Sequence, residues 1–464
     1  MKWHFYGAAQ TTTGSRHLLE VNGARLLIEC GMFQGPRAES IERNSHFPFD
    51  PKSVEAVVLS HAHIDHTGAV PTLVKQGFSG NIYATHGTRD LTSAMLQDSA
   101  HVQRADVEFL NKKLAKKGKP LLAPIYTEKE AELAMRQVVG VGYDRPMWIA
   151  DGVQLRFRDA GHILGSAEVW LDVRENGRRS RVVFSGDLGR GGHPLLRDPS
   201  PVEEADVLVI ESTYGNREHE ATDRINERLC AIINRALERR GKIIIPAFAV
   251  GRTQHLVYAL HQLVEEKCIP ALPIYVDSPL AVNATEIFRL HPECFNTTTY
   301  EQLLARHDPF GMDGLTYIRD VQDSIALNGV EGPCIIISAS GMCEAGRILH
   351  HLKNNIGDER NTVLFVGFAA SHTLGARLMA GAQVAKIFGE EYEVKAQIET
   401  ISAFSAHADR SELLDFARRA TGPLERIAVI HGEPDQANAM ASALREMRPS
   451  ARVDVPALND CLEL

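Results

Sequence analysis

Three histidines and an aspartate lie within six residues of one another in this chain, at His61, His63, Asp65 and His66. They follow the apolar residues 57–59, which predict a buried strand. Imidazole nitrogen is a ligand for zinc and other first-row metals, and a carboxylate completes a hydrolytic site. His61 and His63 alternate as residues at a strand end do, while Asp65 and His66 lie past the turn. The spacing therefore predicts a site for two metal ions rather than surface histidines in a loop.

Three further candidate ligands lie far along the chain, at His162, Asp187 and His407. Each has small residues beside it, which allow the backbone to approach a metal closely. Seven ligands suit two ions, with three side chains on each ion and one bridging carboxylate. Two ions roughly 3.5–4 Å apart can hold a bridging hydroxide and stabilise the attacking and leaving oxygens of a phosphoryl displacement. Such a site needs no serine or cysteine nucleophile.

The composition is typical of soluble globular proteins, with 44% hydrophobic and 23% charged residues. A chain of 464 residues is too long for one ordinary core, so we expect two domains. No apolar stretch approaches the length of a bilayer, and residues 1–7 are typical of a first strand rather than a signal peptide. The seven cysteines are scattered and contain no Cys-x-x-Cys pair, which predicts reduced thiols and no thiolate metal site. We therefore expect a cytoplasmic protein that binds no membrane.

The charge distribution bears on nucleic-acid binding. A net charge of −9 argues against a general nucleic-acid coat but does not exclude a local basic groove. A predicted helix over residues 88–117 has a basic end. Its lysines are Lys112, Lys113, Lys116, Lys117 and Lys119. We interpret this cluster either as a solvated helix terminus or as a surface that attracts polyanions.

The predicted elements change in character along the chain. Asn22-Gly23 between apolar residues 17–21 and 24–28 predicts a type I′ hairpin, and residues 167–173 and 181–185 predict a second one. From about residue 216, helices alternate with apolar strands, which predicts a parallel α/β sheet. The last third returns to short strands and metal-type residues. The α/β segment is therefore interpreted as an insertion between two parts of one β-rich metal domain.

The ligand pattern resembles that of the metallo-β-lactamase superfamily, whose signature is His-x-His-x-Asp-His followed by distant His, Asp and His. The inserted segment resembles the β-CASP domain of the nucleic-acid-processing branch, through residues 210–215, 246–254, 275–280 and 338–342. The resemblance covers nearly the whole chain and is strongest to prokaryotic RNA nucleases similar to the cleavage-and-polyadenylation endonuclease subunit. It implies an α/β fold: an αββα sandwich formed by residues 1–215 and 375–464, with an α/β β-CASP domain inserted at residues 216–374.

The resemblance also implies two Zn²⁺ ions and a role for each ligand. His61, His63 and His162 would bind the first ion, Asp65, His66 and His407 the second, and Asp187 would bridge them. Asp65 and His407 are also expected among the catalytic residues. Glu211, in the first β-CASP motif, would orient a ligating histidine.

Further residues of the family pattern are expected around the metals. The residues expected to contact a substrate phosphate are Arg252, Ser338, Ser340 and Gly341. For Arg252, a capping or salt-bridge role is an equal alternative. His431, in a His-Gly-Glu that the family shares, is interpreted either as a neighbour of the metal site or as a structural residue.

Two departures from the family pattern affect the site. The family usually has aspartate where Glu29 stands, so a hydrogen bond near the histidine run must be rearranged. The family also places a histidine just after Gly-Thr-x-Gly, where it is thought to protonate the leaving oxygen, but Ala376 and Arg377 stand there. His372 lies a few residues upstream as a candidate substitute acid, and Arg377 is the alternative as a residue that only neutralises charge. A missing acid would cost on the order of 10²–10⁴ in rate.

Together these features predict a zinc-dependent ribonuclease that hydrolyses phosphodiester bonds of single-stranded RNA, internally or from the 5′ end. One alternative is a catalytically weak or inactive scaffold subunit of an RNA-processing complex, but all seven ligands are present. Another is a small-molecule ester or thioester hydrolase of the same superfamily, but a small substrate needs no inserted domain. A homodimer is left open.

Overall fold

The chain crosses between two structural units only twice. The computed structural model describes residues 1–220, 224–367, 369 and 372–464. Unit 1 contains Met1–Glu218 and His407–Leu464, and unit 2 contains His219–Ala406. The second crossing therefore lies at residue 406, later than the predicted residue 374. The reason is that strand β19 (Gln397–Thr400) pairs in parallel with β16 (Thr362–Phe365) and so belongs to the sheet of unit 2.

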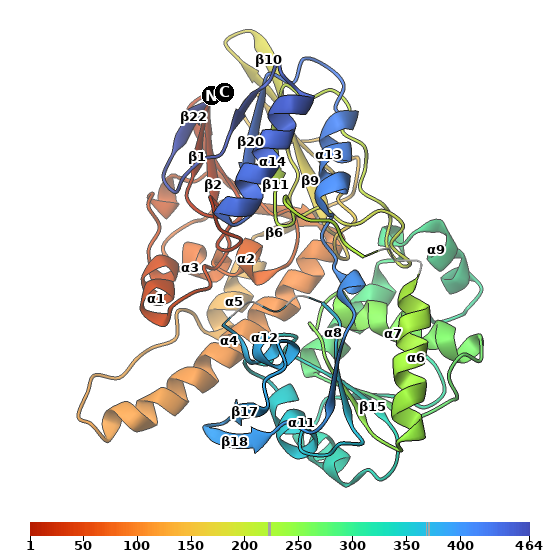
Figure 1. The fold of residues 1–464 in the computed structure, drawn as a ribbon. Coiled ribbons are helices and arrows are strands. Elements are labelled where there is room, and N and C mark those ends of the chain that lie inside the picture. The colour runs from red at the N-terminus through yellow and green to blue at the C-terminus, as the bar shows by residue number, and fades with distance from the viewer. Residues whose placement is uncertain (221–223, 368, 370–371) are drawn as a thin grey trace. The chain divides into compact units, whose positions relative to one another are not determined.

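Unit 1 contains two seven-stranded sheets (Figure 1). Sheet 1 has the order β22-β1-β2-β3-β4-β5-β6. Its strands are β1 (Lys2–Phe5), β2 (His17–Val21), β3 (Ala24–Ile28), β4 (Ala56–Val58), β5 (Asn81–Thr85), β6 (Val138–Val141) and β22 (Cys461–Glu463). Sheet 2 has the order β21-β20-β11-β10-β9-β8-β7. Its strands are β7 (Met147–Ala150), β8 (Val153–Asp159), β9 (Ala167–Glu175), β10 (Arg178–Phe184), β11 (Val207–Glu211), β20 (Arg426–Ile430) and β21 (Arg452–Asp454).

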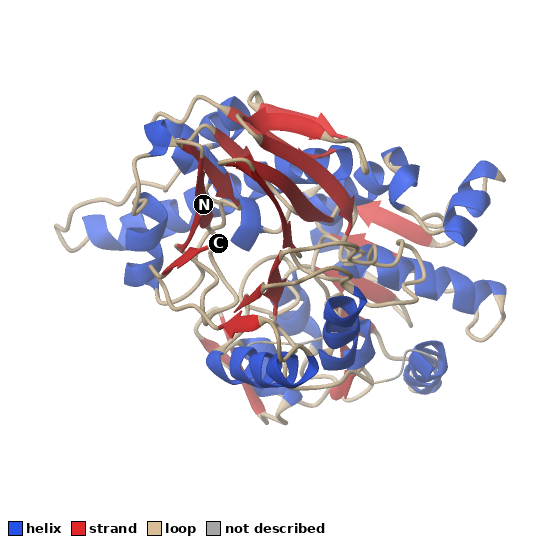
Figure 2. Ribbon diagram, turned by 90° about the horizontal axis from the view of Figure 1, so that it is seen from above, coloured by secondary structure: helices blue, strands red, loops and turns tan. Residues whose placement is uncertain are grey.

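The two sheets of unit 1 face each other across one apolar core. Phe5 and Leu26 of sheet 1 pack in the same buried cluster as Phe157 and Val169 of sheet 2. Helices cover both outer faces, as Figure 2 shows. These helices are α1 (Arg37–Ser45), α2 (Ile64–Thr67), α3 (Val70–Lys75), α4 (His86–Ala115), α5 (Glu128–Met135), α13 (Arg410–Arg419) and α14 (Pro434–Met447). The αββα sandwich predicted from the resemblance is therefore confirmed.

Both predicted hairpins are confirmed. β2 and β3 pair antiparallel around Asn22 and Gly23, whose φ angles are +50° and +81°. β9 and β10 pair antiparallel around Asn176 and Gly177, with φ angles of +52° and +78°. Two consecutive positive φ angles are what a type I′ turn requires, and asparagine and glycine tolerate them best.

Unit 2 contains the predicted parallel sheet, in the order β14-β13-β15-β12-β16-β19. Its other strands are β12 (Ile243–Pro246), β13 (Ile274–Asp277), β14 (Leu315–Ile318), β15 (Ile335–Ser338) and the separate hairpin of β17 (Val384–Ile387) and β18 (Glu390–Glu393). Apolar clusters cover both faces of the six-stranded sheet. The helices are α6 (Ile225–Glu238), α7 (Arg252–Glu265), α8 (Pro279–Leu290), α9 (Thr297–Leu304), α10 (Val321–Ala326), α11 (Ile348–Asn355) and α12 (Leu374–Met379).

The cysteine prediction was wrong at one pair. Cys230 of α6 and Cys268, just after α7, form a disulfide across Cα atoms 6.1 Å apart. The two residues are 38 positions apart in the sequence, so only the packing of α6 beside α7 reveals the pairing. In the described part of the chain, no helix is long and apolar enough to span a bilayer.

Candidate metal centre

The predicted ligands converge because their strands end at the same edge of each sheet. In sheet 1, His61 lies just past β4. In sheet 2, β8 and β10 are both antiparallel to β9, so the loops with His162 and Asp187 leave from one edge. β11 and β20 are parallel to β10 and end at that edge with Glu211 and, one residue past β20, His431. Six segments distant in sequence therefore meet once both sheets have formed, with His407 on the link before α13.

A first donor group consists of His61, His63, His162 and Asp187. The Nδ1 atom of His63 lies 3.1 Å from His61 Nε2 and 3.4 Å from His162 Nε2. The Oδ2 atom of Asp187 lies 3.4 Å from His61 Nε2 and 3.8 Å from His162 Nε2. The structure thus brings together the three histidines predicted for one ion and the predicted bridging carboxylate.

A second donor group consists of Asp65, His66 and His431. His66 Nε2 lies 3.2 Å from His431 Nε2 and 3.7 Å from Asp65 Oδ2. Asp187 Oδ2 lies 3.4 Å from the same His66 nitrogen, so one carboxylate oxygen stands between the two groups. The hydroxyl of Thr213 contacts His431 Nδ1 at 3.2 Å and so directs the other ring nitrogen toward this group.

His407, which was predicted for the second ion, differs from the prediction. Its Nδ1 lies 3.4 Å from each carboxylate oxygen of Glu211. The reason is its place in the chain, because His407 pairs with Gly189 on the link before α13, whereas His431 directly follows β20. The donor group that contains Asp65 and His66 includes His431 and not His407. The signal that identifies His431 is a His-Gly-Glu directly after a buried apolar strand.

Glu29, which stands where the family usually has aspartate, contacts both His66 and Ser60. Its Oε2 lies 2.6 Å from His66 Nδ1, and its Oε1 accepts the backbone N–H of Ser60 at 2.6 Å. Glu29 has a φ of +65°, so the longer side chain starts from a left-handed backbone. The hydroxyl of Ser60 contacts His61 Nδ1 at 2.9 Å. Contacts of this kind fix the tautomer and the ring direction of a ligating histidine.

Burial and neighbouring charges set the protonation of the donor groups. Burial, together with the neighbouring His66, lowers the pKa of His61 well below its usual value and that of His63 to about 4. The neutral imidazole is the form that binds a metal. Burial would also lower the pKa of His66, but the carboxylates of Asp187, Asp65 and Glu29 raise it well above its usual value. The carboxylates around the second donor group therefore favour a cation at this place.

The donor set fits zinc. Tetrahedral Zn–N bonds of about 2.0–2.1 Å place two ligand nitrogens roughly 3.4 Å apart. The nitrogen pairs at 3.1 and 3.4 Å in the first group and 3.2 Å in the second lie close to that separation. Two imidazole nitrogens face His63 Nδ1 at once, and a single proton cannot serve both pairs well, whereas a cation can.

The start of α4 holds the loop that carries His162. The hydroxyls of Thr85 and Thr88 both donate to the carbonyl oxygen of Gly165, at 2.6 and 2.8 Å. Gly165 has a φ of +78°, and a Cβ there would lie 2.3 Å from the backbone nitrogen of Thr88. Only glycine allows so close an approach in this conformation. The loop that carries His162 is thus held against the start of α4 by two hydrogen bonds and a close backbone contact.

The residues predicted to contact phosphate lie in unit 2: Arg252 begins α7 after the loop that follows β12, and Ser338 ends β15. Because these strands are parallel neighbours, the loops that follow them leave the same edge of the sheet. The Ser338 side chain is buried, and its hydroxyl donates to the carbonyl oxygen of Asp277 at 2.9 Å, so its contact with phosphate stays a prediction. The Arg252 guanidinium donates to the carbonyl oxygen of Val366. Ser340 and Gly341 lie on the loop after β15.

His372 also belongs to unit 2. Its side chain is exposed, and its carbonyl oxygen accepts from Arg377 Nη1 at 3.5 Å. Thr373 then caps α12 by accepting from the backbone N–H of Ala376. Ser371, which opens the same stretch, lies outside the described residues. The substitute-acid role of His372 stays a prediction.

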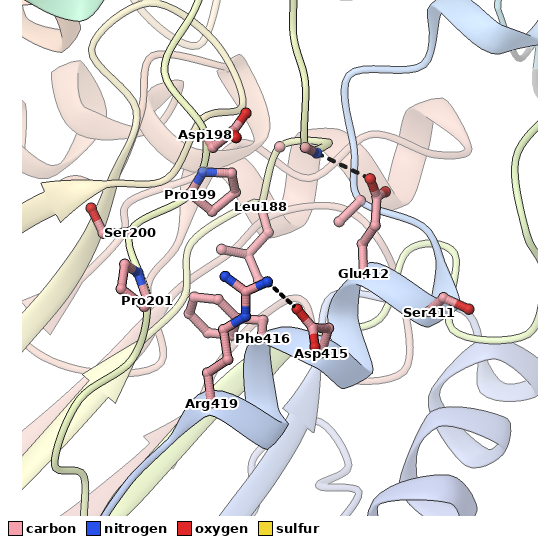
Figure 3. Close-up of a pocket in the computed structure, with 13 residues that line it drawn as sticks. Leu188, Asp198, Pro199, Ser200, Pro201, Ser411, Glu412, Asp415, Phe416 and Arg419 are labelled. Atoms are coloured by element: carbon pink, nitrogen blue, oxygen red, sulfur yellow. Dashed lines mark hydrogen bonds and ion pairs between the residues drawn. The ribbon is translucent and has the colours of Figure 1, made fainter. Parts of the chain in front are cut away.

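A pocket of about 340 Å³ lies beside α13 in unit 1 (Figure 3). Phe416 forms part of its apolar wall. Glu412 accepts the backbone N–H of Gly191 at 3.0 Å, and Arg419 pairs with Asp415 at 2.5 Å. These polar groups of the lining already have partners within the protein, and none of the predicted metal ligands lines the pocket.

Comparison with known proteins identifies the family to which this chain belongs. Family models match residues 14–224 (metallo-beta-lactamase superfamily), 253–378 (Beta-Casp domain) and 391–456 (Zn-dependent metallo-hydrolase RNA specificity domain). A ribonuclease of Thermus thermophilus is 35% identical, over 95% of this chain and 95% of its own. The chain belongs to the β-CASP branch of the metallo-β-lactamase superfamily. This β-CASP protein therefore has both parts of the predicted architecture.

Other relatives extend the comparison. An RNase J-like protein of Methanocaldococcus jannaschii is 30% identical to this β-CASP protein, over 95% of this chain and 94% of its own. The transcription termination factor FttA of the same organism is 28% identical, over 96% of this chain and 68% of its own. A solved structure of an Enterococcus faecalis V583 protein of unknown function matches with a TM-score of 0.56 at 12% identity, over 100% of this chain and 99% of that one. That likeness concerns the fold alone.

Proposed function

We propose that this β-CASP protein is a zinc-dependent ribonuclease that hydrolyses phosphodiester bonds of single-stranded RNA. The observation that carries the proposal is the bridged pair of donor groups, in which Asp187 Oδ2 lies 3.4 Å from His61 Nε2 and 3.4 Å from His66 Nε2. Two relatives that span nearly the whole chain are named as a ribonuclease and an RNase J-like protein, which supports RNA as the substrate.

The ligand assignment follows the donor groups. His61, His63 and His162 would hold one ion, Asp65, His66 and His431 the other, and Asp187 would bridge them. When bound, the ions would supply an activated water as nucleophile and stabilise charge on the phosphate oxygens. The chain itself orients three of the seven donors, His66, His61 and His431, through Glu29, Ser60 and Thr213.

Under this proposal, His407 gives the proton to the leaving oxygen. Glu211 holds His407 at Nδ1, and is itself fixed by the backbone N–H groups of Leu188 at 2.6 Å and Thr213 at 3.3 Å. Burial opposes a charge on His407, but the adjacent carboxylate of Glu211 outweighs it and raises the pKa of His407 above its usual value. An imidazole that keeps its proton at neutral pH suits a general acid. No substitute from His372 is then needed.

The test uses the purified full-length protein. Elemental analysis should find about two zinc ions per chain, and single-stranded RNA should be cleaved until a chelator removes the metal. RNA labelled at its 5′ or 3′ end separates internal cutting from trimming at the 5′ end. Bound zinc without RNA cleavage would favour the scaffold alternative, and hydrolysis of a thioester without RNA cleavage would favour the small-molecule alternative.

A further inference from the structure

The second half of α4 extends away from the core of unit 1 (Figure 1). The buried residues of this 30-residue helix end at Ala100, and none of residues 101–115 is buried. The α4 arm is defined here as residues 101–125. An isolated helical segment of about 15 residues is marginal in water, so residues 101–115 need contacts other than those of the helix itself.

The return segment of the α4 arm gives it a defined shape. Asn111 donates from Nδ2 to the carbonyl oxygen of Leu122 at 2.9 Å and accepts the Leu122 N–H at 2.8 Å. The N–H of Ile125 donates to Gln103 Oε1 at 3.2 Å. The chain then re-enters the core at the fully buried Tyr126. The arm is therefore a folded hairpin of helix and extended chain.

The tip of the α4 arm, defined as residues 109–119, has a strongly positive charge, whereas the whole protein is acidic. Residues 109–127 contain no aspartate or glutamate, while the whole chain has a net charge of −9. The exposed lysines of the tip are Lys112, Lys113, Lys116, Lys117 and Lys119. Within the described residues, none of these ammonium groups is paired with a carboxylate. Lysines in the last turn alone would complement the helix dipole, but three of the five lie beyond the end of α4.

An exposed aromatic ring lies among these lysines. Phe109 is 57% exposed, and Lys113 Nζ lies 4.2 Å from the centre of its ring. Sites for single-stranded nucleic acid combine cationic groups that follow the backbone with aromatic rings on which bases stack. Protein interfaces, in contrast, are depleted in lysine and enriched in arginine, and the tip contains five lysines and no arginine.

We propose that the lysine-rich tip of the α4 arm is a second binding site for single-stranded RNA, with the phosphates on the lysines and a base on Phe109. This site deepens the proposed ribonuclease function and rests on it for its role. At 1.5 Å per residue, α4 extends roughly 45 Å from the threonines that hold the His162 loop. The tip would therefore hold a distant part of a long substrate, and a short oligonucleotide would not reach it.

The first experiment measures RNA affinity with the metal-loaded full-length protein. The ligand is single-stranded RNA with a phosphorothioate backbone, which slows hydrolysis. The tip variant replaces five lysines with glutamine: Lys112, Lys113, Lys116, Lys117 and Lys119. The control variant replaces five other exposed lysines and changes the net charge equally: Lys2, Lys52, Lys267, Lys386 and Lys395.

The tip variant should bind the RNA at least about tenfold more weakly, with a slope of log affinity against log salt reduced by about 0.7 per lost phosphate contact. Phe109→Leu should weaken binding by about tenfold through lost stacking. The control variant should lose much less. Equal losses in the two lysine variants would overturn the proposal. Because no residue of 101–115 is buried, the thermal unfolding of the tip variant should match that of the wild type.

Two further measurements are made in parallel. The first distinguishes an RNA site at the tip from a protein interface there. The second separates a failure of the tip site from a failure of the proposed ribonuclease. Light scattering reports the oligomeric state, and a tip variant with altered oligomeric state and unchanged RNA affinity would identify a protein interface instead. Cleavage of unmodified RNA by the wild type reports the proposed function. Cleavage without tip-dependent binding overturns only the second site, whereas tip-dependent binding without cleavage overturns only the ribonuclease. If the protein shows both RNA cleavage and tip-dependent binding, the substitutions of the tip variant should raise KM for a long RNA more than for a tetranucleotide.

Discussion

Two histidines near the metal centre have different partners, and the residues themselves can be told apart by experiment. His431 shares its donor group with Asp65 and His66, while His407 faces Glu211. A ligand should control metal content, whereas a proton donor should control rate. Assigning the two roles therefore needs both measurements on the same variants.

His431→Ala should lower the zinc content from about two ions per chain to about one, because the second group loses one of its donors. His407→Ala should keep both ions and lose about 10²–10⁴ in kcat, the usual contribution of a general acid. Elemental analysis and single-turnover cleavage of RNA measure the two effects. Loss of zinc in His407→Ala with normal zinc in His431→Ala would restore the assignment made from sequence order. His372→Ala serves as the matched comparison and should leave kcat unchanged.

Among the elements of unit 1, α4 contributes to both proposed sites. Its first turn holds the His162 loop through Thr85 and Thr88, and its far end carries the lysine-rich tip. The contact at the first turn depends on Gly165, where a side chain would collide with the backbone of α4. The position of the proposed ligand His162 is therefore set by the packing of a helix against a glycine.

Gly165→Ala should lower the zinc content and the free energy of unfolding, since the new Cβ pushes the His162 loop away from α4. Gly177→Ala is a matched control, because Gly177 has the same φ of +78° but no atom within 4 Å of the position that a Cβ would take. Both variants bear the backbone strain of about 1 kcal/mol or more, and only Gly165→Ala adds the collision. Urea unfolding and elemental analysis should show the larger loss in Gly165→Ala. Equal losses would show that the glycine contact does not position the metal site.

For the whole molecule, the proposed metal centre belongs to unit 1 alone. Each unit has its own apolar clusters, and every residue of the two donor groups lies in unit 1. Metal binding should therefore stabilise unit 1 directly, by about 4 kcal/mol when free metal exceeds its dissociation constant a thousandfold. The three tryptophans, Trp3, Trp148 and Trp170, also all lie in unit 1.

Tryptophan fluorescence of the full-length protein thus reports the unfolding of unit 1, and calorimetry reports both units. A chelator should lower the thermal transition seen by fluorescence, while a second calorimetric transition stays in place. A single transition that shifts as a whole would show that the two units unfold together. An unchanged fluorescence transition would contradict the placement of the metals in unit 1.

Local spacing was enough to predict much of this protein. The run from His61 to His66 follows a short buried strand, so residue types and the geometry of a strand end predict four candidate metal ligands within one segment, and all four lie in the two donor groups. The two hairpins follow from Asn-Gly pairs, whose positive φ angles are a local property. Alternating helices and apolar strands likewise indicated the parallel sheet of the inserted unit.

Only the tertiary structure decided the features that depend on where distant segments meet. His431 rather than His407 joins Asp65 and His66 because β20 is hydrogen-bonded beside β11, which no spacing in the sequence reveals. The pairing of Cys230 with Cys268 and the return of the chain at residue 406 have the same origin. The sequence by itself determined which chemistry the ligands support, since that depends on residue type. Which histidine completes the site depends on the pairing of strands hundreds of residues apart, and that is a property of the folded sheets alone.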